Sequence, residues 1–404
     1  MSNIVVGLDI GTTKVTAIVG EIAEDESINI IGVGITPSHG MEKGMVVNVE
    51  ETTLCIQRAI EDAQRMADLP IDLVYIGVAG SHIESINNSA VKQVTGDQSI
   101  VDSADVDHLL AEVQDIHVPD GKEIIHSIVR GYKLDNELLQ DPLGMKGSTL
   151  ELSAHIIYGA TNSIQNLITC AFNVQLSVAQ VILQPLASAN AVLNEDERKM
   201  GVALVDIGGG TTDIAIFKGG KLNYTKVIPV GGTHFTNDLA YFLTTGFSEA
   251  EKLKIRYGTV DPKKVDKNLV LEVGVVGGDE KRKVSADVLC EVLEPRADEL
   301  SNLILEALAE GVGDLKELSA GIVITGGGSQ IRGFEAMLQK KSGLAVRLGK
   351  VKSVNGLTQK VSNPMYATGV GLIHYGYHNY EKFAYDTKEG LFGKIFTTIK
   401  GWFL

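Results

Sequence analysis

Two short stretches of the sequence place an aspartate, a glycine turn and a pair of threonines next to one another. The first is LDIGTTK at residues 8–14, and the second is VDIGGGTTD at residues 205–213. In each, an apolar run typical of a buried strand ends in an aspartate, and a tight turn opens the next strand. Glycine has no Cβ, so backbone N–H groups and threonine hydroxyls can approach an anion closely. Either stretch alone could be an ordinary β-turn, but together they predict two hairpins that hold one triphosphate.

The residues of these hairpins divide between phosphate and metal. Magnesium is a hard cation that prefers carboxylate oxygens and water, so we expect Asp9 and Asp206 to hold Mg²⁺, through water. The expected nucleotide-binding residues are Asp9, Gly11, Thr12, Thr13 and Lys14 in the first hairpin and Asp206, Gly208, Gly209, Gly210, Thr211, Thr212 and Asp213 in the second.

A third glycine-rich stretch lies in the last quarter of the chain. VITGGGSQIRGFEAML, residues 323–338, reads as a strand, a glycine triplet and a helix, which suits packing against an adenine ring and its ribose. By itself it could be a plain strand-to-helix turn. Because it follows the two hairpins in the chain, it favours a site in which Gly326, Gly327 and Gly328 contact adenosine.

The elements that must position these turns are repeated along the chain. Three β-rich runs within residues 3–36 precede an amphipathic helix over residues 48–69 and a strand over residues 73–80. The same βββαβ order recurs between residues 201 and 328. We therefore expect an α/β fold with two duplicated lobes around a cleft. Residues 85–161 lie between the copies as a small inserted α/β domain, and the second copy contains a charge-rich insertion over residues 229–305.

The composition limits the classes of function. The chain has 404 residues, with 51 Asp and Glu against 36 Lys and Arg, for a net charge of −15. This length exceeds the usual size of one domain, and the negative field argues against a nucleic-acid partner. Cys55, Cys170 and Cys290 stand singly, which supports neither a disulfide framework nor a zinc site. Without a signal-peptide pattern or an apolar run near about 18 residues, we expect a cytoplasmic protein that does not span a membrane.

Two further stretches are rich in small residues, QPLASANAVL at residues 184–193 and MYATGVGL at residues 365–372. Together with the hairpins and the adenosine turn, they make the chain resemble the actin, Hsp70 and sugar-kinase superfamily. This resemblance implies that the two small-residue helices cross at a hinge between the lobes. It also implies that Gln184 faces the attacking water and the metal.

The same resemblance assigns further residues to the adenosine. Glu251 and Lys254 match the positions that hold it, and Gly231 and Gly232 match the loop that closes over it, although an E-x-x-K pair is more often an ordinary helical ion pair. Gln184 can orient a water but cannot accept its proton. We therefore expect a nucleotide-binding scaffold for ATP and Mg²⁺ with at most slow ATP hydrolysis. The alternative is a small-molecule, sugar-type kinase with the same fold.

Over essentially its whole length the chain resembles the FtsA family of bacterial cell-division proteins, through GITPSHGMEKGMVVNVEET, IGVAGSHIES, SEAEKLKIRYG and GIVITGGGSQIRGF. The place of the domain inserted at residues 85–161 is typical of that family. The resemblance implies an actin-like protein that polymerises and anchors the FtsZ ring to the inner face of the cytoplasmic membrane at the division site. The lobe at residues 229–305 would bind the C-terminal peptide of FtsZ, with Arg296 as one contact; an ion pair within the lobe is the alternative for Arg296. Other division proteins are possible partners of residues 85–161.

This resemblance also sets the expected domain boundaries. Residues 1–84, 162–193 and 365–380 form the first core lobe (1A), and residues 194–228 and 306–364 form the second (2A). The inserted small domain is 1C (85–161), and subdomain 2B spans 229–305. A linker (381–389) precedes a membrane-targeting amphipathic helix (390–404).

The last stretch, GLFGKIFTTIKGWFL, has the pattern of a surface helix. At about 100° per residue, its large apolar side chains other than Leu404 fall within an arc of about 140°, and the lysines, threonines and two of the glycines fill the remainder. Such a helix could lie on a membrane or dock on the protein's own core. The polar stretch before it indicates a tether, which favours the membrane. The lipid-facing residues are then Leu391, Phe392, Ile395, Phe396, Ile399, Trp402 and Phe403.

Overall fold

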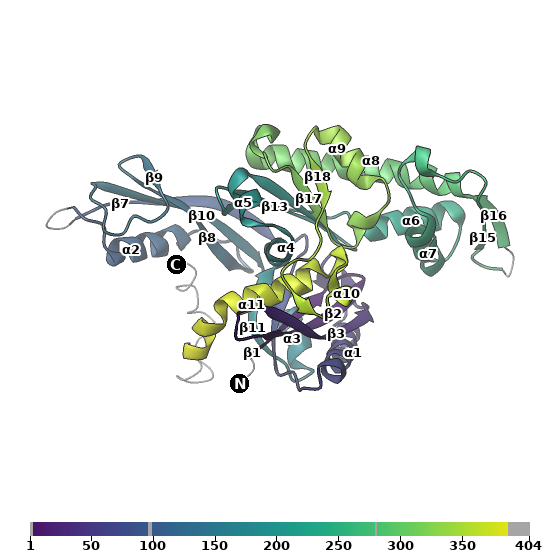
Figure 1. The fold of residues 1–404 in the computed structure, drawn as a ribbon, viewed down its shortest axis with the longest axis horizontal. Helices are drawn as coiled ribbons and strands as arrows, with labels where there is room; N and C mark the ends of the chain where they lie inside the picture. Colours follow the sequence, from purple (N-terminus) through teal and green to yellow (C-terminus); the bar gives the residue numbers. More distant parts are fainter. Residues whose placement is uncertain (1–2, 96–98, 279–280, 387–404) are drawn as a thin grey trace.

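The computed structural model describes residues 3–95, 99–278 and 281–386 and contains two central β-sheets (Figure 1). The first has the strand order β11-β6-β1-β2-β3-β19, and the second has the order β14-β13-β12-β17-β18. In the first sheet the strands are β1 (Asn3–Ile10), β2 (Lys14–Ile22), β3 (Ile28–Pro37), β6 (Leu73–Val78), β11 (Ser177–Leu183) and β19 (Asn355–Gly356). In the second they are β12 (Val202–Ile207), β13 (Thr212–Lys218), β14 (Lys221–Ile228), β17 (Ile322–Thr325) and β18 (Val346–Leu348).

The two sheets repeat one arrangement. In the first, β1 pairs with β2 in antiparallel fashion on one side and with β6 in parallel on the other. In the second, β12 pairs in the same way with β13 and β17. The equivalent strands β1 and β12 carry Asp9 and Asp206 near their ends. This repetition confirms the predicted α/β fold with duplicated lobes.

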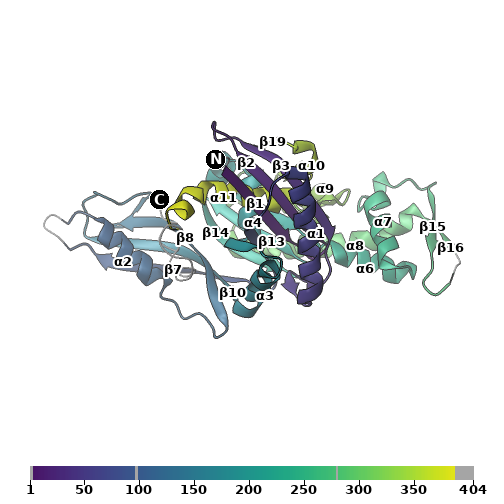
Figure 2. The same cartoon turned by 90° about the horizontal axis from the view of Figure 1, so that it is seen from below.

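Helices cover the first sheet on both faces (Figure 2). On one face lie α1 (Val49–Ala67) and α3 (Thr161–Phe172), and α11 (Ala367–Asp386) lies on the other. The helix α1 is capped by Asn48, whose side chain accepts a hydrogen bond from the N–H of Glu51 at 3.2 Å. It lies directly on β3, because a Cβ added to Gly34 would stand 1.8 Å from the carbonyl oxygen of Ala59. Glycine in the strand therefore permits the close packing of α1.

The helices α4 (Gln184–Val192) and α11 lie between the two sheets and contact each other. A Cβ added to Gly371 would stand 1.9 Å from the carbonyl oxygen of Ala187, so the backbones of the two helices meet directly. The apolar cluster around them includes Leu8 and Leu204, which come from different sheets. The small residues at 184–193 and 365–372 thus allow one core to join the two halves.

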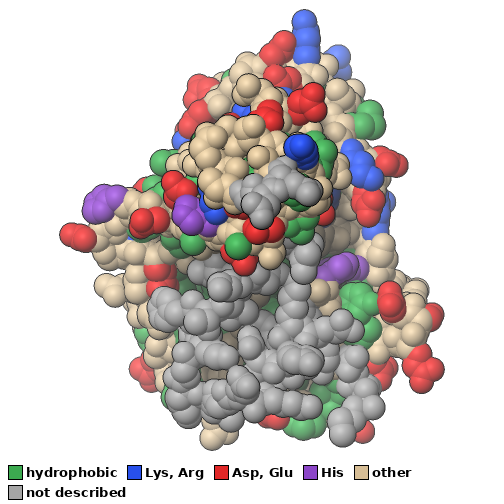
Figure 3. Space-filling model, turned by 90° about the vertical axis from the view of Figure 1, so that its left-hand side faces the viewer, with side chains coloured by type: hydrophobic (Ala, Val, Ile, Leu, Met, Phe, Trp, Pro, Cys, Tyr) green, Lys and Arg blue, Asp and Glu red, His purple; other side chains and the backbone are tan. Residues whose placement is uncertain are grey.

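The inserted segment forms its own sheet of order β7-β10-β8-β9, seen at the left of Figure 1. Its elements are β7 (Glu84–Gln93), α2 (Ser103–Gln114), β8 (Lys122–Leu134), β9 (Glu137–Leu139) and β10 (Thr149–Ala160). It contacts β14 of the second half, where the guanidinium of Arg130 donates to the side-chain oxygen of Asn223 at 2.9 and 3.1 Å. On the visible part of its outer face, acidic and basic side chains are interspersed (Figure 3).

The second half carries an outer part, seen at the right of Figure 1. It consists of α6 (Gly232–Leu243), α7 (Phe247–Tyr257), the hairpin β15 (Val270–Gly274) and β16 (Lys281–Ser285), and the start of α8 (Ala286–Val312). The remaining elements are the hairpin β4 (Met41–Glu42) and β5 (Met45–Val46), the helices α5 (Glu195–Met200), α9 (Phe334–Ser342) and α10 (Thr358–Val361), and the short 3₁₀ turns η1 (Pro262–Lys264), η2 (Leu315–Glu317), η3 (Gly328–Gln330) and η4 (Pro364–Tyr366).

The C-terminal region differs from expectation in one respect. The helix α11 continues to Asp386, so residues 381–386, predicted as part of a linker, have helical backbone. The sequence contains no glycine or proline between residues 377 and 389 that would end the helix. The predicted membrane helix at residues 390–404 lies outside the described residues. Within residues 3–95, 99–278 and 281–386, no helix has the length and apolar character needed to span a bilayer.

Candidate functional site

The two predicted hairpins face each other across the halves of the molecule. Each turn is closed by one backbone hydrogen bond of 2.9 Å, from Gly11 to Lys14 and from Gly208 to Thr211. A Cβ added to Gly209 would stand 2.4 Å from the Cγ2 atom of Thr13. The two turns thus contact each other, and glycine is required for that contact.

The strand-end aspartates lie at the base of these turns. The carboxylate of Asp9 accepts from the Lys14 ammonium and from the Gln184 amide, each at 3.2 Å. The carboxylate of Asp206 accepts from the Ser188 hydroxyl at 2.5 Å. Burial, and to a smaller extent the charge of Asp9, raises the pKa of Asp206 to about 6, against the hydrogen bond from Ser188. The structure therefore brings Asp9, Asp206 and Gln184 together, as expected from the sequence.

The third acid, Asp213, has the most unusual environment. It is 3% exposed, and its Oδ2 atom accepts from the Thr211 hydroxyl at 2.9 Å. Its Oδ1 atom has no hydrogen-bond partner among the described residues. Burial, followed by the charge of Asp206, raises the pKa of Asp213 to about 7, against the hydrogen bond from Thr211. Asp213 can therefore exchange a proton near neutral pH.

The acids limit how a metal ion could be held. In the described part of the chain, no group of three or more His, Cys, Asp or Glu side chains is arranged to bind a metal. A divalent cation beside Asp9 and Asp206 would consequently take most of its ligands from water and from a bound anion. This set of oxygen donors fits Mg²⁺, which usually keeps several waters.

A second cluster lies at the start of α6. The ammonium of Lys254 donates to the carbonyl oxygen of Gly232 at 2.9 Å and to the Thr236 hydroxyl at 2.8 Å. It also pairs with Glu251 at 2.7 Å, so the ion pair anticipated as the alternative for this motif is present. The side chain of Lys254 is only 10% exposed, and burial lowers its pKa, although the charge of Glu251 opposes this. The cluster fixes the Gly231–Gly232 turn, whose Gly232 N–H donates to the carbonyl oxygen of Gly208 at 2.9 Å.

The glycine triplet after β17 closes the same site. Gly326 has a positive φ of 83°, and a Cβ there would stand 2.3 Å from the Oδ1 atom of Asp206. A Cβ on Gly232 would lie 3.9 Å from the Cα atom of Gly328. All three predicted glycine turns therefore converge on one place, although they come from distant parts of the chain.

The expected partner residue Arg296 is engaged within its own lobe. Its guanidinium donates to both carboxylate oxygens of Asp238, at 2.7 and 2.9 Å, and to Glu299 at 2.5 Å. These contacts raise the pKa of Arg296, chiefly through the hydrogen bond with Asp238. Arg296 therefore forms an ion pair within its own lobe, which was the alternative considered for this residue.

Several side chains of the site were missed from the sequence. Thr236 and Thr368 hydrogen-bond to Lys254 and Asp206, respectively, but single threonines in helices carry no distinctive signal. Lys43, in the β4–β5 hairpin, lies beside both predicted phosphate turns: its Cα atom would be 3.1 Å from a Cβ on Gly210, and the N–H of its neighbour Gly44 donates to the Thr12 hydroxyl at 3.2 Å. Its only signal in the sequence is the lysine–glycine pair of the short MEKGM stretch, which by itself indicates no more than a turn.

Solved structures of low sequence identity share the fold. The PilM–PilN type IV pilus biogenesis complex contains a chain that aligns with a TM-score of 0.69 and 14% identity, covering 92% of this chain and 98% of that one. MreB5 of Spiroplasma citri bound to ADP aligns with a TM-score of 0.57 and 15% identity, covering 96% and 99%. The MamK double helical filament gives a TM-score of 0.54 and 13% identity, covering 92% and 98%. These matches show an actin-like fold.

Sequence comparison identifies the family. A model described as cell division protein FtsA matches residues 203–371, and one described as the SHS2 domain inserted in FtsA matches residues 80–158. The cell division protein FtsA of Pseudomonas aeruginosa is 44% identical over 92% of this chain and 89% of its own length. The FtsA proteins of Neisseria meningitidis and Escherichia coli are 39% and 40% identical, over 91% and 92% of this chain and 88% and 90% of their own lengths. The chain therefore belongs to the FtsA family of cell-division proteins.

Proposed function

We propose that this protein binds ATP with Mg²⁺ in the cleft between its two halves and uses the nucleotide to control its own assembly. The observation that carries the proposal is the convergence of three glycine turns on the buried carboxylates Asp9 and Asp206. Glycine turns expose backbone N–H groups to phosphate, and paired carboxylates require a cation or protons nearby. A related fold, MreB5 of Spiroplasma citri, was solved bound to ADP, which supports the choice of ligand.

Within this proposal the predicted residues take distinct roles. The hairpins at residues 11–14 and 208–212 bind the phosphates, and Asp9 and Asp206 hold Mg²⁺ through water. Bound there, the cation would neutralise phosphate charge. Glu251, Lys254 and the glycines at residues 231–232 and 326–328 enclose the adenosine.

Hydrolysis would depend on two side chains. The amide nitrogen of Gln184 is held by Asp9 at 3.2 Å, which leaves its carbonyl oxygen to orient a water molecule. Gln184 cannot accept a proton, but Asp213, with a pKa near 7, can do so. Since Asp213 is about half protonated at neutral pH and largely protonated below it, we propose slow turnover that serves as a switch.

The proposed location is the inner face of the cytoplasmic membrane at the division site. Residues 390–404 would lie on the lipid, with the phenylalanines and Trp402 at headgroup depth. Burying a large apolar side chain contributes roughly 1.5–3 kcal/mol, but interfacial burial is partial and ordering the chain costs entropy. One helix would therefore bind moderately, and a filament that presents many helices would bind tightly.

The proposed partner is the C-terminal peptide of FtsZ, bound by the lobe at residues 229–305. This lobe exposes large apolar side chains on α6 and α7, and the ring centroids of two of them, Tyr241 and Phe247, lie 6.1 Å apart. We refer to the four exposed residues as the α6–α7 patch: Tyr241 (77% exposed), Phe242 (61%), Phe247 (55%) and Ile255 (68%). Exposed aromatic clusters favour protein contacts. Because Arg296 is already paired with Asp238, we assign the binding energy to this patch. Phe242→Ser should weaken binding of the peptide; unchanged affinity would place the contact elsewhere.

The membrane proposal is tested by co-sedimentation with anionic vesicles. The full chain and a chain ending at Lys388 are compared, each with and without Mg-ATP. We expect only the full chain to sediment with lipid, and more of it with ATP. If both chains stay in solution, residues 390–404 are not an anchor, and phosphorylation of added small metabolites becomes the activity to measure next.

A further inference from the structure

The hairpin of β4 and β5 lies beside both phosphate turns and has an unusual tip. Met41 pairs with Val46 and Glu42 with Met45, so Lys43 and Gly44 form the turn. Their φ angles are 47° and 80°. Two-residue turns of this kind favour Asn-Gly or Gly-Gly, and a lysine in the left-handed region costs conformational free energy. A residue held there at a cost is a candidate for a function that needs its side chain.

The tip of this hairpin contacts both halves of the nucleotide cleft. The N–H of Gly44 donates to the Thr12 hydroxyl at 3.2 Å. A Cβ on Gly210 would stand 2.7 Å from that hydroxyl oxygen and 3.1 Å from the Cα atom of Lys43. The charge of Lys43 also acts on the second half, where it helps to lower the pKa of His234 in addition to the effect of burial. Lys43 therefore stands where the two phosphate turns meet.

The charge balance at this point favours Lys43 as an anion ligand. Lys14, the other cation at the phosphate turns, is already paired with Asp9 at 3.2 Å. Lys43 is exposed and forms no salt bridge with any residue that the structure describes. We propose that Lys43 binds the terminal phosphate of the nucleotide and that its hairpin transmits the presence of this phosphate to the inserted domain. This inference rests on the nucleotide-binding function proposed above.

The route to the inserted domain consists of backbone contacts. A Cβ on Gly44 would stand 2.7 Å from the carbonyl oxygen of Ala79, and one on Gly80 would stand 3.1 Å from that of Lys43. Such contacts cannot be relieved by rotating a side chain, so a shift of the tip must move the loop at residues 79–83. The base of the hairpin is fixed, because the N–H groups of Val47 and Asn48 donate to the carbonyl oxygen of Gly40 at 2.8 and 3.1 Å.

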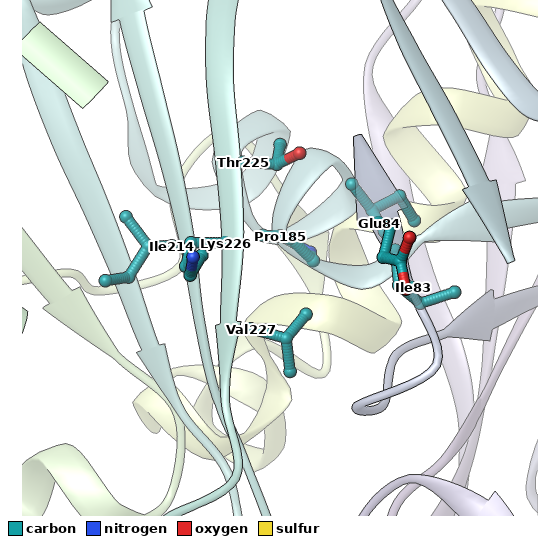
Figure 4. Close-up of a pocket in the computed structure, with 8 residues that line it drawn as sticks. Ile83, Glu84, Pro185, Ile214, Thr225, Lys226 and Val227 are labelled. Atoms are coloured by element: carbon teal, nitrogen blue, oxygen red, sulfur yellow. The ribbon is translucent and has the colours of Figure 1, made fainter. Parts of the chain in front are cut away.

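This loop leads directly into the inserted sheet. Both ring nitrogens of His82 are buried without a hydrogen-bond partner among the described residues, so no polar contact holds its ring in place. Ile83 and Glu84 then line a small cavity together with Thr225 and Lys226 of β14 (Figure 4). Here the hydroxyl of Ser85 donates to the carbonyl oxygen of Thr225 at 3.2 Å. Movement of the loop would thus change how the inserted domain contacts the second half.

The first test compares ATP and ADP affinity by calorimetry, with Mg²⁺ and the full chain. The variants are Lys43→Ala, the charge-retaining Lys43→Arg, and Lys263→Ala as a matched control at an exposed lysine that lies outside the site. Because Lys43→Ala removes a charge-assisted hydrogen bond to the terminal phosphate, it should weaken ATP binding about tenfold or more, and ADP binding much less. Lys43→Arg should retain the preference for ATP, and Lys263→Ala should bind as the unaltered chain does.

The second test measures backbone hydrogen exchange over residues 79–93 with each nucleotide. The unaltered chain should exchange differently with ATP and ADP in this segment, and Lys43→Ala should lose that difference. An unchanged ratio of ATP to ADP affinity in Lys43→Ala would overturn the phosphate contact while nucleotide binding stands. A selective loss of ATP affinity with an unaltered exchange pattern would overturn the coupling. Failure of the unaltered chain to bind either nucleotide would instead contradict the proposed function.

Discussion

Replacing Asp213 by asparagine should stabilise the nucleotide-free protein at alkaline pH and not at acidic pH. The ordinary pKa of an aspartate is 3.8, and burial raises that of Asp213 to about 7. The folded chain therefore binds this proton more tightly than the unfolded chain. The stability that this provides is fully present below about pH 4 and is lost as the pH rises through about 7. The asparagine of the variant would carry no charge at any pH, so the variant should not lose this stability as the pH rises.

The magnitude follows from the width of the pH window. Each pKa unit corresponds to about 1.4 kcal/mol, so between pH 5 and pH 7 the unaltered chain should lose about 2–3 kcal/mol of unfolding free energy on account of Asp213. The asparagine keeps an acceptor for the Thr211 hydroxyl but buries an N–H2 group, at a constant cost of about 1–3 kcal/mol. This constant cost does not affect how the difference in unfolding free energy between the variant and the unaltered chain changes with pH. The difference should stop growing above about pH 7.

The assay is urea unfolding without nucleotide and with a chelator, at several pH values from 5 to 8. Asp107→Asn serves as the control, because Asp107 is exposed on α2. The difference between Asp213→Asn and the unaltered chain should grow in favour of the variant across this range, while Asp107→Asn shows no trend. A difference that stays constant from pH 5 to pH 8 would refute the reasoning, because Asp213 would then ionise as an ordinary carboxyl group.

Two other substitutions test the contact between α4 and α11 and the proposed adenosine site. Gly371→Ala should destabilise the chain by roughly 1–3 kcal/mol, because its Cβ would stand 1.9 Å from the carbonyl oxygen of Ala187. Thermal unfolding measures this loss of stability. Gly274→Ala is the control and should change the stability little, because there is open space around Gly274. Lys254→Met should weaken the binding of ATP and of ADP equally, by about tenfold, because the buried ammonium donates a hydrogen bond of 2.9 Å that fixes the carbonyl oxygen of Gly232. A loss of affinity restricted to ATP would place Lys254 at the terminal phosphate instead.

The parts of the site that could be predicted from sequence depend on local geometry. An apolar run that ends in Asp9 or Asp206 before a glycine turn has few structural solutions, and the structure contains both hairpins as expected. The small residues at 187 and 371 likewise indicated a close helix contact, because a larger side chain cannot fit between backbones. In each case the residue type itself reports a steric or conformational requirement.

The parts that could not be predicted depend on distant neighbours. Whether Arg296 was free or paired depended on Asp238, which lies on another helix. The raised pKa of Asp213 results from burial and from Asp206, neither of which its own stretch reveals. The extension of α11 to Asp386 shows a third case, since a polar sequence without glycine or proline can continue a helix that tertiary packing has started.

The buried acids and the contacting turns both affect how a cation and phosphates could bind between the two halves. The charge of Asp206 raises the cost of ionising Asp213, so the cleft favours cations or protons up to a pH of about 7. The turns at Thr13 and Gly209 already lie in contact, so we expect the halves to move apart when phosphates bind between them. Because α4 and α11 meet at Gly371, we expect this helix contact to be the pivot of such a motion. On this argument, a cation and phosphates that bind between the acids would set both the protonation of the cleft and the separation of the two halves.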